Sequence, residues 1–308
     1  MIVAILDLGT NTCNLLIAEV SKDKSFQILY EEKTPVLLGK KGTDKRYITS
    51  EANERTLTVF EKYHQIISEY KAEYSIAFGT SAMRSSLNAA ELAEKIQTKV
   101  GIHIEIIDGE REAQLIYKGI RLTGCLDNEY SVIMDIGGGS TEFIIGNSRE
   151  ILWKNSFELG SSILLRFINP SDPMTQDEIN KCELFLDKEL KILYNAFFHY
   201  PCKKLIGASG AFDSFYSMIT VESNSTENNK KYHLFEPGIL EQLHYKLLKS
   251  TLAEREKMPG LPVFRANYIV LASVFVNFVK NKLKVNEIIH SAYALKEGAL
   301  AEVIEHLK

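Results

Sequence analysis

The sequence lacks the features that mark several large classes of protein. Its 308 residues contain four cysteines, Cys13, Cys125, Cys182 and Cys202, and no CxxC pair. We therefore expect free, mostly buried thiols in a reducing compartment. None of the seven histidines forms a pair at metal-ligand spacing, and no Ser-His-Asp pattern is present. Direct ligation of zinc by the protein is therefore not expected.

Strong basic charge is also missing. The net charge is −4, and no run of lysine or arginine is longer than a pair. This argues against duplex nucleic acid as the main partner, because binding to its phosphate backbone normally requires a basic face. A polyanionic substrate stays open, provided that positive potential is local to a cleft.

Long hydrophobic runs are absent as well. The stretch from Tyr268 to Val279 is shorter than the roughly 20 residues that span a bilayer, and it favours a helix buried on most faces. Asp7 interrupts the apolar stretch Ile2 to Leu6 after five residues. We therefore expect no signal peptide, no membrane partner and a cytoplasmic protein.

What is present fits two globular domains. A chain of 308 residues corresponds to two domains of about 150 residues each. The polar stretch Glu222 to Lys231 is expected to be a mobile connection.

An internal sequence repeat divides the chain into two parts. Leu6-Asp7-Leu8-Gly9 recurs as Met134-Asp135-Ile136-Gly137 at an offset of 128 residues, and Leu15-Leu16-Ile17 recurs as Phe143-Ile144-Ile145 at the same offset. Each copy is typical of a strand, a glycine-rich turn and a second strand, and a β-like stretch follows, FQILYEE in one copy and EILWKNSFEL in the other. The repeat indicates duplicated α/β domains that enclose a cleft.

Periodicity and capping residues predict the remaining elements. Before the second copy we expect helices over Ser50 to Tyr70, Asn88 to Val100 and the segment EREAQLIYKGI, and strands over Tyr74 to Phe78 and Ile102 to Ile107. After it we expect mainly helices, over Thr175 to Phe198, Pro237 to Ser250, Ala266 to Lys280 and Ala292 to Leu307, with a strand and turn at residues 203–210.

The segment Asp135 to Glu142, DIGGGSTE, carries the most specific signal. Gly137, Gly138 and Gly139 allow a tight turn whose N–H groups can point at one anion, and Ser140 and Thr141 add hydroxyls. Asp135 follows an apolar strand, where a carboxylate can hold a metal ion or its water. The alternative is a glycine-rich hairpin without a ligand.

The companion loop runs from Asp7 to Thr12. Its residues Gly9, Thr10, Asn11 and Thr12 can donate to the same phosphate from the opposite side. A DxGT string alone is a weak signal, and the pairing with the second loop is what makes it strong.

Two further segments offer charged groups. Glu110 and Glu112 in DGEREA diverge on a first helical turn, so only one need face a cleft as a general base, and a residue that merely compensates the helix dipole is the alternative. Arg84 in FGTSAMR follows a strand-to-helix turn and is the predicted phosphate contact, with a solvated surface arginine as the alternative.

A weaker motif is Gly207-Ala-Ser209-Gly210. It follows a short apolar strand and could let the backbone approach a nucleotide or a phosphate chain. A simple strand-to-helix turn explains it about as well.

Together these stretches resemble the exopolyphosphatase/guanosine pentaphosphate phosphohydrolase (Ppx/GppA) family of the actin-like ATPase superfamily. The resemblance covers nearly the whole chain. Its matching stretches are DLGTNTCNLLIAEV, GTSAMRSSLNAAE, IIDGEREAQLIYKGI, MDIGGGSTEFIIG, SFELGSS, GASGAF, EREKMPGLPVFRA and IIHSAYALKEGAL.

The resemblance implies a fold, a site and a substrate class. The fold is α/β, with two duplicated RNase H-like domains around a central cleft, over 1–125 joined by 292–308 and over 126–291. Glu112 would be the catalytic base, Glu142 would support catalysis and metal binding, and Arg84 would be the arginine of the cleft. A Mg²⁺ or similar divalent ion would lie near Asp7, Asp135 and Glu142. The implied substrates are polyphosphate or a guanosine penta- or tetraphosphate, and a homodimer is also implied.

Some features depart from the family pattern. The chain ends at 308, as expected for the short two-domain form without a C-terminal helical HD-type domain. Ser161-Ser162-Ile163 stands where many relatives have a basic residue, and Asn267 stands where the family usually has Asp. These differences concern chain-length preference and nucleotide recognition.

Two rival functions use the same loops. One is an ATPase or kinase of the superfamily, although the chain is short for a kinase. The other is a non-catalytic sensor of an alarmone or polyphosphate, which the presence of both Glu112 and Glu142 disfavours.

Overall fold

The computed structural model describes residues 1–39, 47–222 and 230–306. The chain forms two compact units: unit 1 comprises Met1–Leu122 and Leu295–Lys308, and unit 2 comprises Thr123–Ala294. The predicted connection over residues 222–231 lies largely outside the described residues.

Unit 1 is built around one mixed sheet. Its strands are β1 (Ile2–Leu8), β2 (Thr12–Val20), β3 (Phe26–Pro35), β4 (Tyr74–Gly79) and β5 (Ile104–Ile106). Its helices are α1 (Ser50–Glu69), α2 (Ser81–Ser85), α3 (Ala89–Val100), α4 (Gly109–Arg121) and α12 (Leu295–His306).

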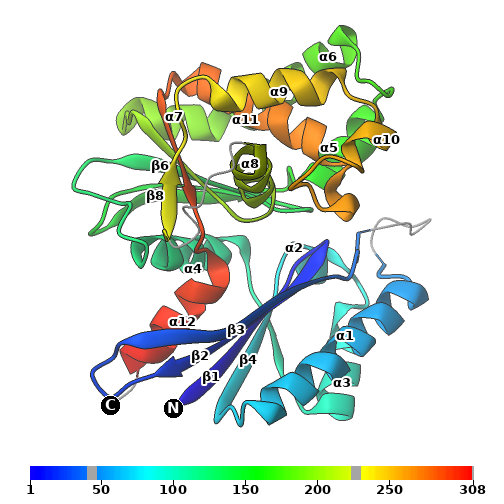
Figure 1. The fold of residues 1–308 in the computed structure, drawn as a ribbon, viewed down its shortest axis with the longest axis vertical. Coiled ribbons are helices and arrows are strands. Elements are labelled where there is room, and N and C mark those ends of the chain that lie inside the picture. The colour runs from blue at the N-terminus through cyan, green and yellow to red at the C-terminus, as the bar shows by residue number, and fades with distance from the viewer. Residues whose placement is uncertain (40–46, 223–229, 307–308) are drawn as a thin grey trace. The chain divides into compact units, whose positions relative to one another are not determined.

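The sheet of unit 1 has the strand order β3-β2-β1-β4-β5. Strands β1, β2 and β3 are antiparallel neighbours, whereas β4 and β5 add parallel to the other side of β1. Helices α1 and α3 pack on one face of this sheet (Figure 1). Ala4, Leu6 and Leu15 belong to the same buried cluster as apolar residues of α1 and α3. Because side chains alternate along a strand, Asp7 points to the opposite face, and α12 packs against β1 and β2.

Helix α12 is held closely to α4. A Cβ atom at Gly298 would lie 1.8 Å from the carbonyl oxygen of Leu115, so only glycine allows this crossing. Arg111 and Lys118 of α4 form ion pairs with Glu302 of α12. The last described segment of the chain therefore returns to unit 1 and fixes the helix that carries Glu112.

Unit 2 repeats this design. Its strands are β6 (Ser131–Ile136), β7 (Thr141–Gly146), β8 (Ile151–Phe157), β9 (Lys204–Ala208), β10 (Tyr232–Leu234) and β11 (Glu287–Ser291). Its helices are α5 (Ser161–Ile168), α6 (Gln176–Glu189), α7 (Lys191–His199), α8 (Ser209–Glu222), α9 (Ile239–Lys249), α10 (Leu252–Arg255) and α11 (Ile269–Leu283), with a 3₁₀ turn at Val263–Arg265.

The sheet of unit 2 has the order β10-β11-β9-β6-β7-β8. Read from the other edge, β8-β7-β6-β9-β11 has the same arrangement as β3-β2-β1-β4-β5, with three antiparallel strands followed by two parallel ones. The predicted duplication of an α/β domain is thereby confirmed.

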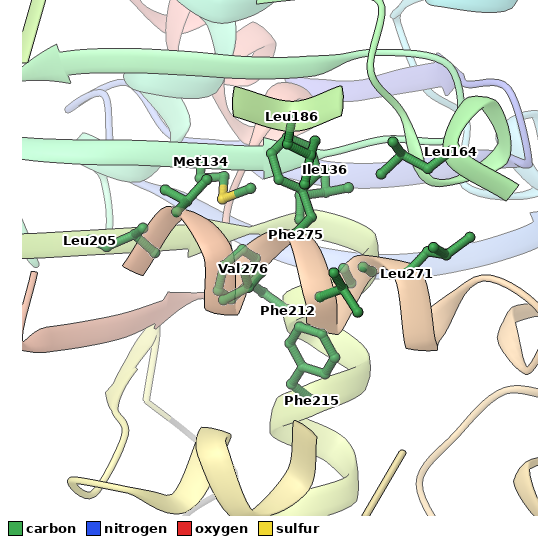
Figure 2. Close-up of a cluster of buried hydrophobic side chains, with 14 of the residues drawn as sticks. Met134, Ile136, Leu164, Leu186, Leu205, Phe212, Phe215, Leu271, Phe275 and Val276 are labelled. Carbon is green, nitrogen blue, oxygen red and sulfur yellow. The ribbon is translucent and has the colours of Figure 1, made fainter. Parts of the chain in front are cut away.

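The core of unit 2 lies between this sheet and α11. Figure 2 shows Met134 and Ile136 of β6 meeting Leu271 and Phe275 of α11 in one apolar layer. Helix α11 is buried along most of its length, which confirms the prediction for Tyr268 to Val279. Among the helices of the described residues, none combines the length and the apolar character needed to cross a bilayer. All four cysteines are buried and form no disulfide, as expected.

Two predictions for the second half were wrong in detail. The single helix expected over Thr175 to Phe198 is divided into α6 and α7 at Leu190, which is fully buried and has φ −90° and ψ 12°. The half predicted to be mainly helical also contributes the strands β10 and β11. Strand β11 has the sequence Glu-Ile-Ile-His-Ser, which is too short and too mixed to show a strand period.

Candidate active site

The first glycine-rich turn joins β1 to β2. The N–H of Gly9 donates to the carbonyl oxygen of Thr12 over 2.9 Å and closes the turn. The carbonyl oxygens of Thr10 and Asn11 accept from backbone N–H groups of residues 36–38, which braces the turn from outside. Thr10 is buried, and its Oγ1 has no hydrogen-bond partner within the described part of the chain.

The second turn joins β6 to β7 and has the same geometry. The N–H of Gly137 donates to the carbonyl oxygen of Ser140 over 2.9 Å, which is the bond of Gly9 and Thr12 repeated at an offset of 128 residues. Ser140 and Thr141 are buried. The predicted hairpins with glycine-rich turns are thus both present.

Helix α5 supports the second turn, a contact that was not predicted from the sequence. The N–H groups of Ser161 and Ser162 donate to the carbonyl oxygens of Gly137 and Gly138 over 3.0 and 2.9 Å. A Cβ atom at Gly160 would lie 2.3 Å from the backbone of Gly138. Glycine at position 160 therefore allows α5 to begin directly against the turn.

Two carboxylates lie on neighbouring strands beside the second turn. Asp135 on β6 is paired in register with Glu142 on β7, so both side chains lie on one face of the sheet. They are 6% and 1% exposed. Ser209 Oγ donates to Asp135 over 2.7 Å, and Ser156 Oγ donates to Glu142 over 2.6 Å. Two buried like charges repel unless a cation compensates them.

In unit 1, Arg84 and Glu112 form an ion pair. Arg84 Nη1 lies 2.9 Å from Oε2 of Glu112, and the same nitrogen donates to the carbonyl oxygen of Ile107 over 3.0 Å. The pair joins α2, which follows β4, to α4, which follows β5. The parallel strands β4 and β5 thus bring together two residues that were predicted separately from the sequence.

The two glutamates of the segment DGEREA differ in their exposure to solvent. Helix α4 begins after Asp108, whose side chain accepts from the N–H of Arg111 over 2.7 Å as an N-terminal cap. Glu112 is buried, whereas Glu110 is exposed. The prediction that the two diverge is confirmed, and Glu112 is the one that Arg84 contacts.

The third glycine motif lies between β9 and α8. Ser209 has φ +57° in the left-handed region, and its hydroxyl is the group that donates to Asp135. A Cβ atom at Gly207 would lie 2.1 Å from the ring of Phe212. The motif is a strand-to-helix turn, the alternative considered for it, but one that also supports Asp135.

Arg265 was not among the predicted site residues. A Cβ atom at Gly210 would lie 2.7 Å from Nη1 of Arg265, so the guanidinium covers this glycine. Burial lowers the pKa of Arg265, while Asp213 and Asp135 act to raise it. The sequence signal that could have found it is the matching stretch EREKMPGLPVFRA, in which Arg265 lies.

Each unit therefore contains its own group of candidate site residues. Unit 1 carries the turn from Gly9 to Thr12, Asp7 and the Arg84–Glu112 pair; unit 2 carries the turn from Gly137 to Thr141, the Asp135–Glu142 pair and Arg265. Among the described residues, no three His, Cys, Asp or Glu side chains form a group that could hold a metal ion. A metal ion would need ligands besides these side chains.

Comparison with known proteins defines the class. The family model of the Ppx/GppA phosphatase family matches residues 16–307. The match covers most of the chain, and the chain belongs to the Ppx/GppA phosphatase family. It is an enzyme of the phosphatase class.

Two solved structures and one further relative are similar to this chain. An exopolyphosphatase from Cytophaga hutchinsonii is 36% identical with a TM-score of 0.96, over 100% of this chain and 99% of that chain. The Ppx/GppA family member of Aquifex aeolicus is 25% identical with a TM-score of 0.83, over 100% and 99% of the two chains. A bifunctional 3-dehydroquinate synthase/phosphatase of Fusobacterium nucleatum is 38% identical over 167 residues, which are 51% of this chain and 25% of that relative's length.

Proposed function

We propose that this chain hydrolyses terminal phosphoanhydride bonds of polyphosphate, or of a guanosine penta- or tetraphosphate, and releases inorganic phosphate. The observation that carries the proposal is the buried Glu112 held 2.9 Å from Arg84 at the start of α4. The arginine fixes the position of this carboxylate, and its guanidinium fork also suits phosphate oxygens, so the carboxylate lies where a phosphate group could be bound. The likeness to the Cytophaga hutchinsonii exopolyphosphatase supports polyphosphate as a substrate.

Different residues would bind the phosphates and activate the water. N–H groups of the turns at residues 9–12 and 137–141 would bind phosphate oxygens, since turns of successive N–H groups are anion-binding concavities. Arg84 donates to Glu112 through Nη1, and a guanidinium has further donors for a phosphate oxygen. Glu112 would accept a proton from the attacking water.

The carboxylates of unit 2 fit a divalent cation. Mg²⁺ is usually held by one or two carboxylates together with water and substrate phosphates, and Asp135 and Glu142 provide two carboxylates on neighbouring strands. When bound, the ion would offset the charge of the phosphates. Asp7, the third carboxylate predicted for this ion, belongs to unit 1 and already accepts a hydrogen bond from Asn14.

The test is phosphate release with Mg²⁺ from long polyphosphate, short polyphosphate and guanosine pentaphosphate. We expect release from at least one of them, and loss of release when the divalent ion is chelated. Tight binding without release from any of the three would contradict the proposal and favour the sensor. ADP formation from ATP with a sugar or acid acceptor would favour a kinase. The homodimer stays a prediction, which sedimentation of the purified chain would test.

A further inference from the structure

Strand β11 brings a buried histidine close to the edge of the unit 2 sheet that carries the candidate site. His290 on β11 is paired in register with Gly207 on β9, which in turn is paired with Met134 on β6. These three strands are parallel, so their carboxyl ends lie at one edge of the sheet. His290 is 5% exposed. A titratable group on β11 is therefore buried just behind the site.

Helix α8 holds the imidazole of His290 by two contacts. Nε2 of His290 lies 3.1 Å from Oδ1 of Asp213. A carboxylate only accepts, so this nitrogen carries the hydrogen of the bond. The ring of Tyr216, three residues further along α8, stacks on the imidazole, with ring centroids 4.7 Å apart and an angle of 14° between the planes. The stack fixes the plane of the imidazole and so the direction of its bond to Asp213.

The carboxylate of Asp213 lies on the part of α8 that the guanidinium of Arg265 covers. Gly210 and Asp213 are three residues apart on this helix, so they are neighbours on its surface. A Cβ atom at Gly210 would lie 2.7 Å from Nη1 and 3.3 Å from Cζ of Arg265. Burial lowers the pKa of Arg265, and Asp213 followed by Asp135 acts to raise it. Of these two carboxylates, Asp213 therefore has the larger effect on the guanidinium.

The backbone that carries Arg265 is fixed by other contacts. Nε of Arg255, a buried arginine on α10, donates to the carbonyl oxygen of Ala266 over 2.9 Å. A Cβ atom at Gly260 would lie 2.6 Å from the carbonyl oxygen of Ser217, so the loop before Arg265 packs directly on the backbone of α8. These contacts place the main chain of Arg265, but a long side chain loses its rotamer freedom only when its guanidinium is also held.

We propose that Asp213 and His290 are positioning residues for Arg265. His290 holds the carboxylate of Asp213, and Asp213 holds the guanidinium of Arg265 over Gly210, where it can donate to a phosphate group. This inference rests on the proposed function, because the anion that Arg265 would meet there is a phosphate of that substrate. A planar guanidinium binds two phosphate oxygens only in one orientation. Loss of the bond from His290 should therefore weaken binding, although His290 itself does not contact the ligand.

Two substitutions of His290 separate this role from a purely structural one. His290→Phe keeps a ring that can stack on Tyr216 but has no N–H group for Asp213. His290→Gln keeps an N–H donor of similar reach and loses the ring. If the bond to Asp213 orients Arg265, His290→Phe weakens binding and His290→Gln restores it. If His290 only packs between α8 and β11, the order is reversed, because phenylalanine is the better replacement for a stacked ring.

The inference is tested by the dissociation constant of inorganic tripolyphosphate for the full chain, measured by isothermal titration calorimetry with divalent ions chelated. We expect Arg265→Gln to bind at least about tenfold more weakly than the wild type. His290→Phe should bind about three- to tenfold more weakly, and His290→Gln within about twofold of the wild type. In the Arg265→Gln background, His290→Phe should cause no further loss, because the side chain that it positions is gone. Thermal unfolding of each variant shows that it folds.

Four results would overturn the inference. They are a wild type that does not bind tripolyphosphate, a His290→Phe variant that binds as the wild type does, a His290→Gln variant weaker than His290→Phe, and an equal loss from His290→Phe with and without Arg265. Failure of the proposed function is distinct, since the affinities would then follow the expected pattern while no phosphate is released from polyphosphate or guanosine pentaphosphate with Mg²⁺.

Discussion

Arg84 donates to Glu112 over 2.9 Å, so the arginine expected to bind phosphate is fixed to the acid expected to act as base. The same nitrogen of Arg84 donates to the carbonyl oxygen of Ile107, just after β5, which anchors the pair to the sheet. The hydrogen bond therefore ties the position of Glu112, the expected base, to that of Arg84, the residue expected to bind phosphate. A change at one of the two residues should disturb the other.

Replacing Arg84 by methionine should lower kcat/KM about 10- to 100-fold, because hydrogen bonds to charged groups contribute roughly 1.5–3 kcal/mol. Steady-state phosphate release measures this. Arg121→Met, which removes an exposed arginine from the same unit, is the control and should behave as the wild type. An Arg84→Met enzyme within about twofold of the wild type would show that Arg84 does not bind the substrate.

Gly160→Ala should impair the second turn. Its new methyl group would overlap the backbone of Gly138 at 2.3 Å, and overpacking of this kind costs about 1–3 kcal/mol. We expect a raised KM together with a lowered melting temperature.

Gly238→Ala is the matched control for Gly160→Ala. Gly238 has φ +83°, and no atom of the described residues lies within 4 Å of the position that a Cβ would take, so alanine there adds backbone strain without a clash. It should lower stability while KM stays that of the wild type. A Gly160→Ala enzyme with normal KM would mean that α5 does not hold the turn.

His244 should make unit 2 sensitive to acid. It is buried, and burial lowers its pKa. Ser273 Oγ donates to the carbonyl oxygen of Val270, so His244 Nδ1, 3.0 Å away, must be the donor to Ser273. The pocket that His244 lines is formed by the apolar residues Phe215, Leu243 and Val276 together with Glu241 and Lys280, whose charges act on the pKa of His244 in opposite directions.

The sign of this effect follows from linkage. The unfolded chain binds the proton more readily than the folded one, so stability is full above the ordinary histidine pKa of about 6.5 and falls as the pH drops below it. Melting temperatures measured from pH 8 to pH 5 should decline less in His244→Gln than in the wild type or in His199→Gln, which alters an exposed histidine. Parallel curves for all three would contradict this.

The features that could be predicted from the sequence are those formed by residues close together in the chain. The turns at Gly9 and Gly137 and the start of α4 after Asp108 are each formed by residues within a few positions of one another, so composition and spacing identify them. Glu112 could be separated from Glu110 because two positions on a first helical turn point in different directions. The repeated strands also made the duplicated α/β fold predictable.

The rest depends on contacts between distant segments. Lys33 lies opposite Asn14 only through the register of β2 and β3, and Arg265 reaches Gly210 from a different loop. The contact of Gly160 with Gly138 likewise requires α5 to fold back on the turn. No local pattern carries these pairings, which is why Asn14 and Lys33 could not be singled out before the fold was known.

The central claim is that Glu112 acts as the base of a phosphoanhydride hydrolase. Glu112→Gln keeps the size of the side chain and its ability to accept from Arg84, and it should lower phosphate release from polyphosphate by about 10²- to 10⁴-fold. Glu110→Gln, in the same helical turn but exposed, should release phosphate as the wild type does. A Glu112→Gln enzyme with full activity would contradict the account.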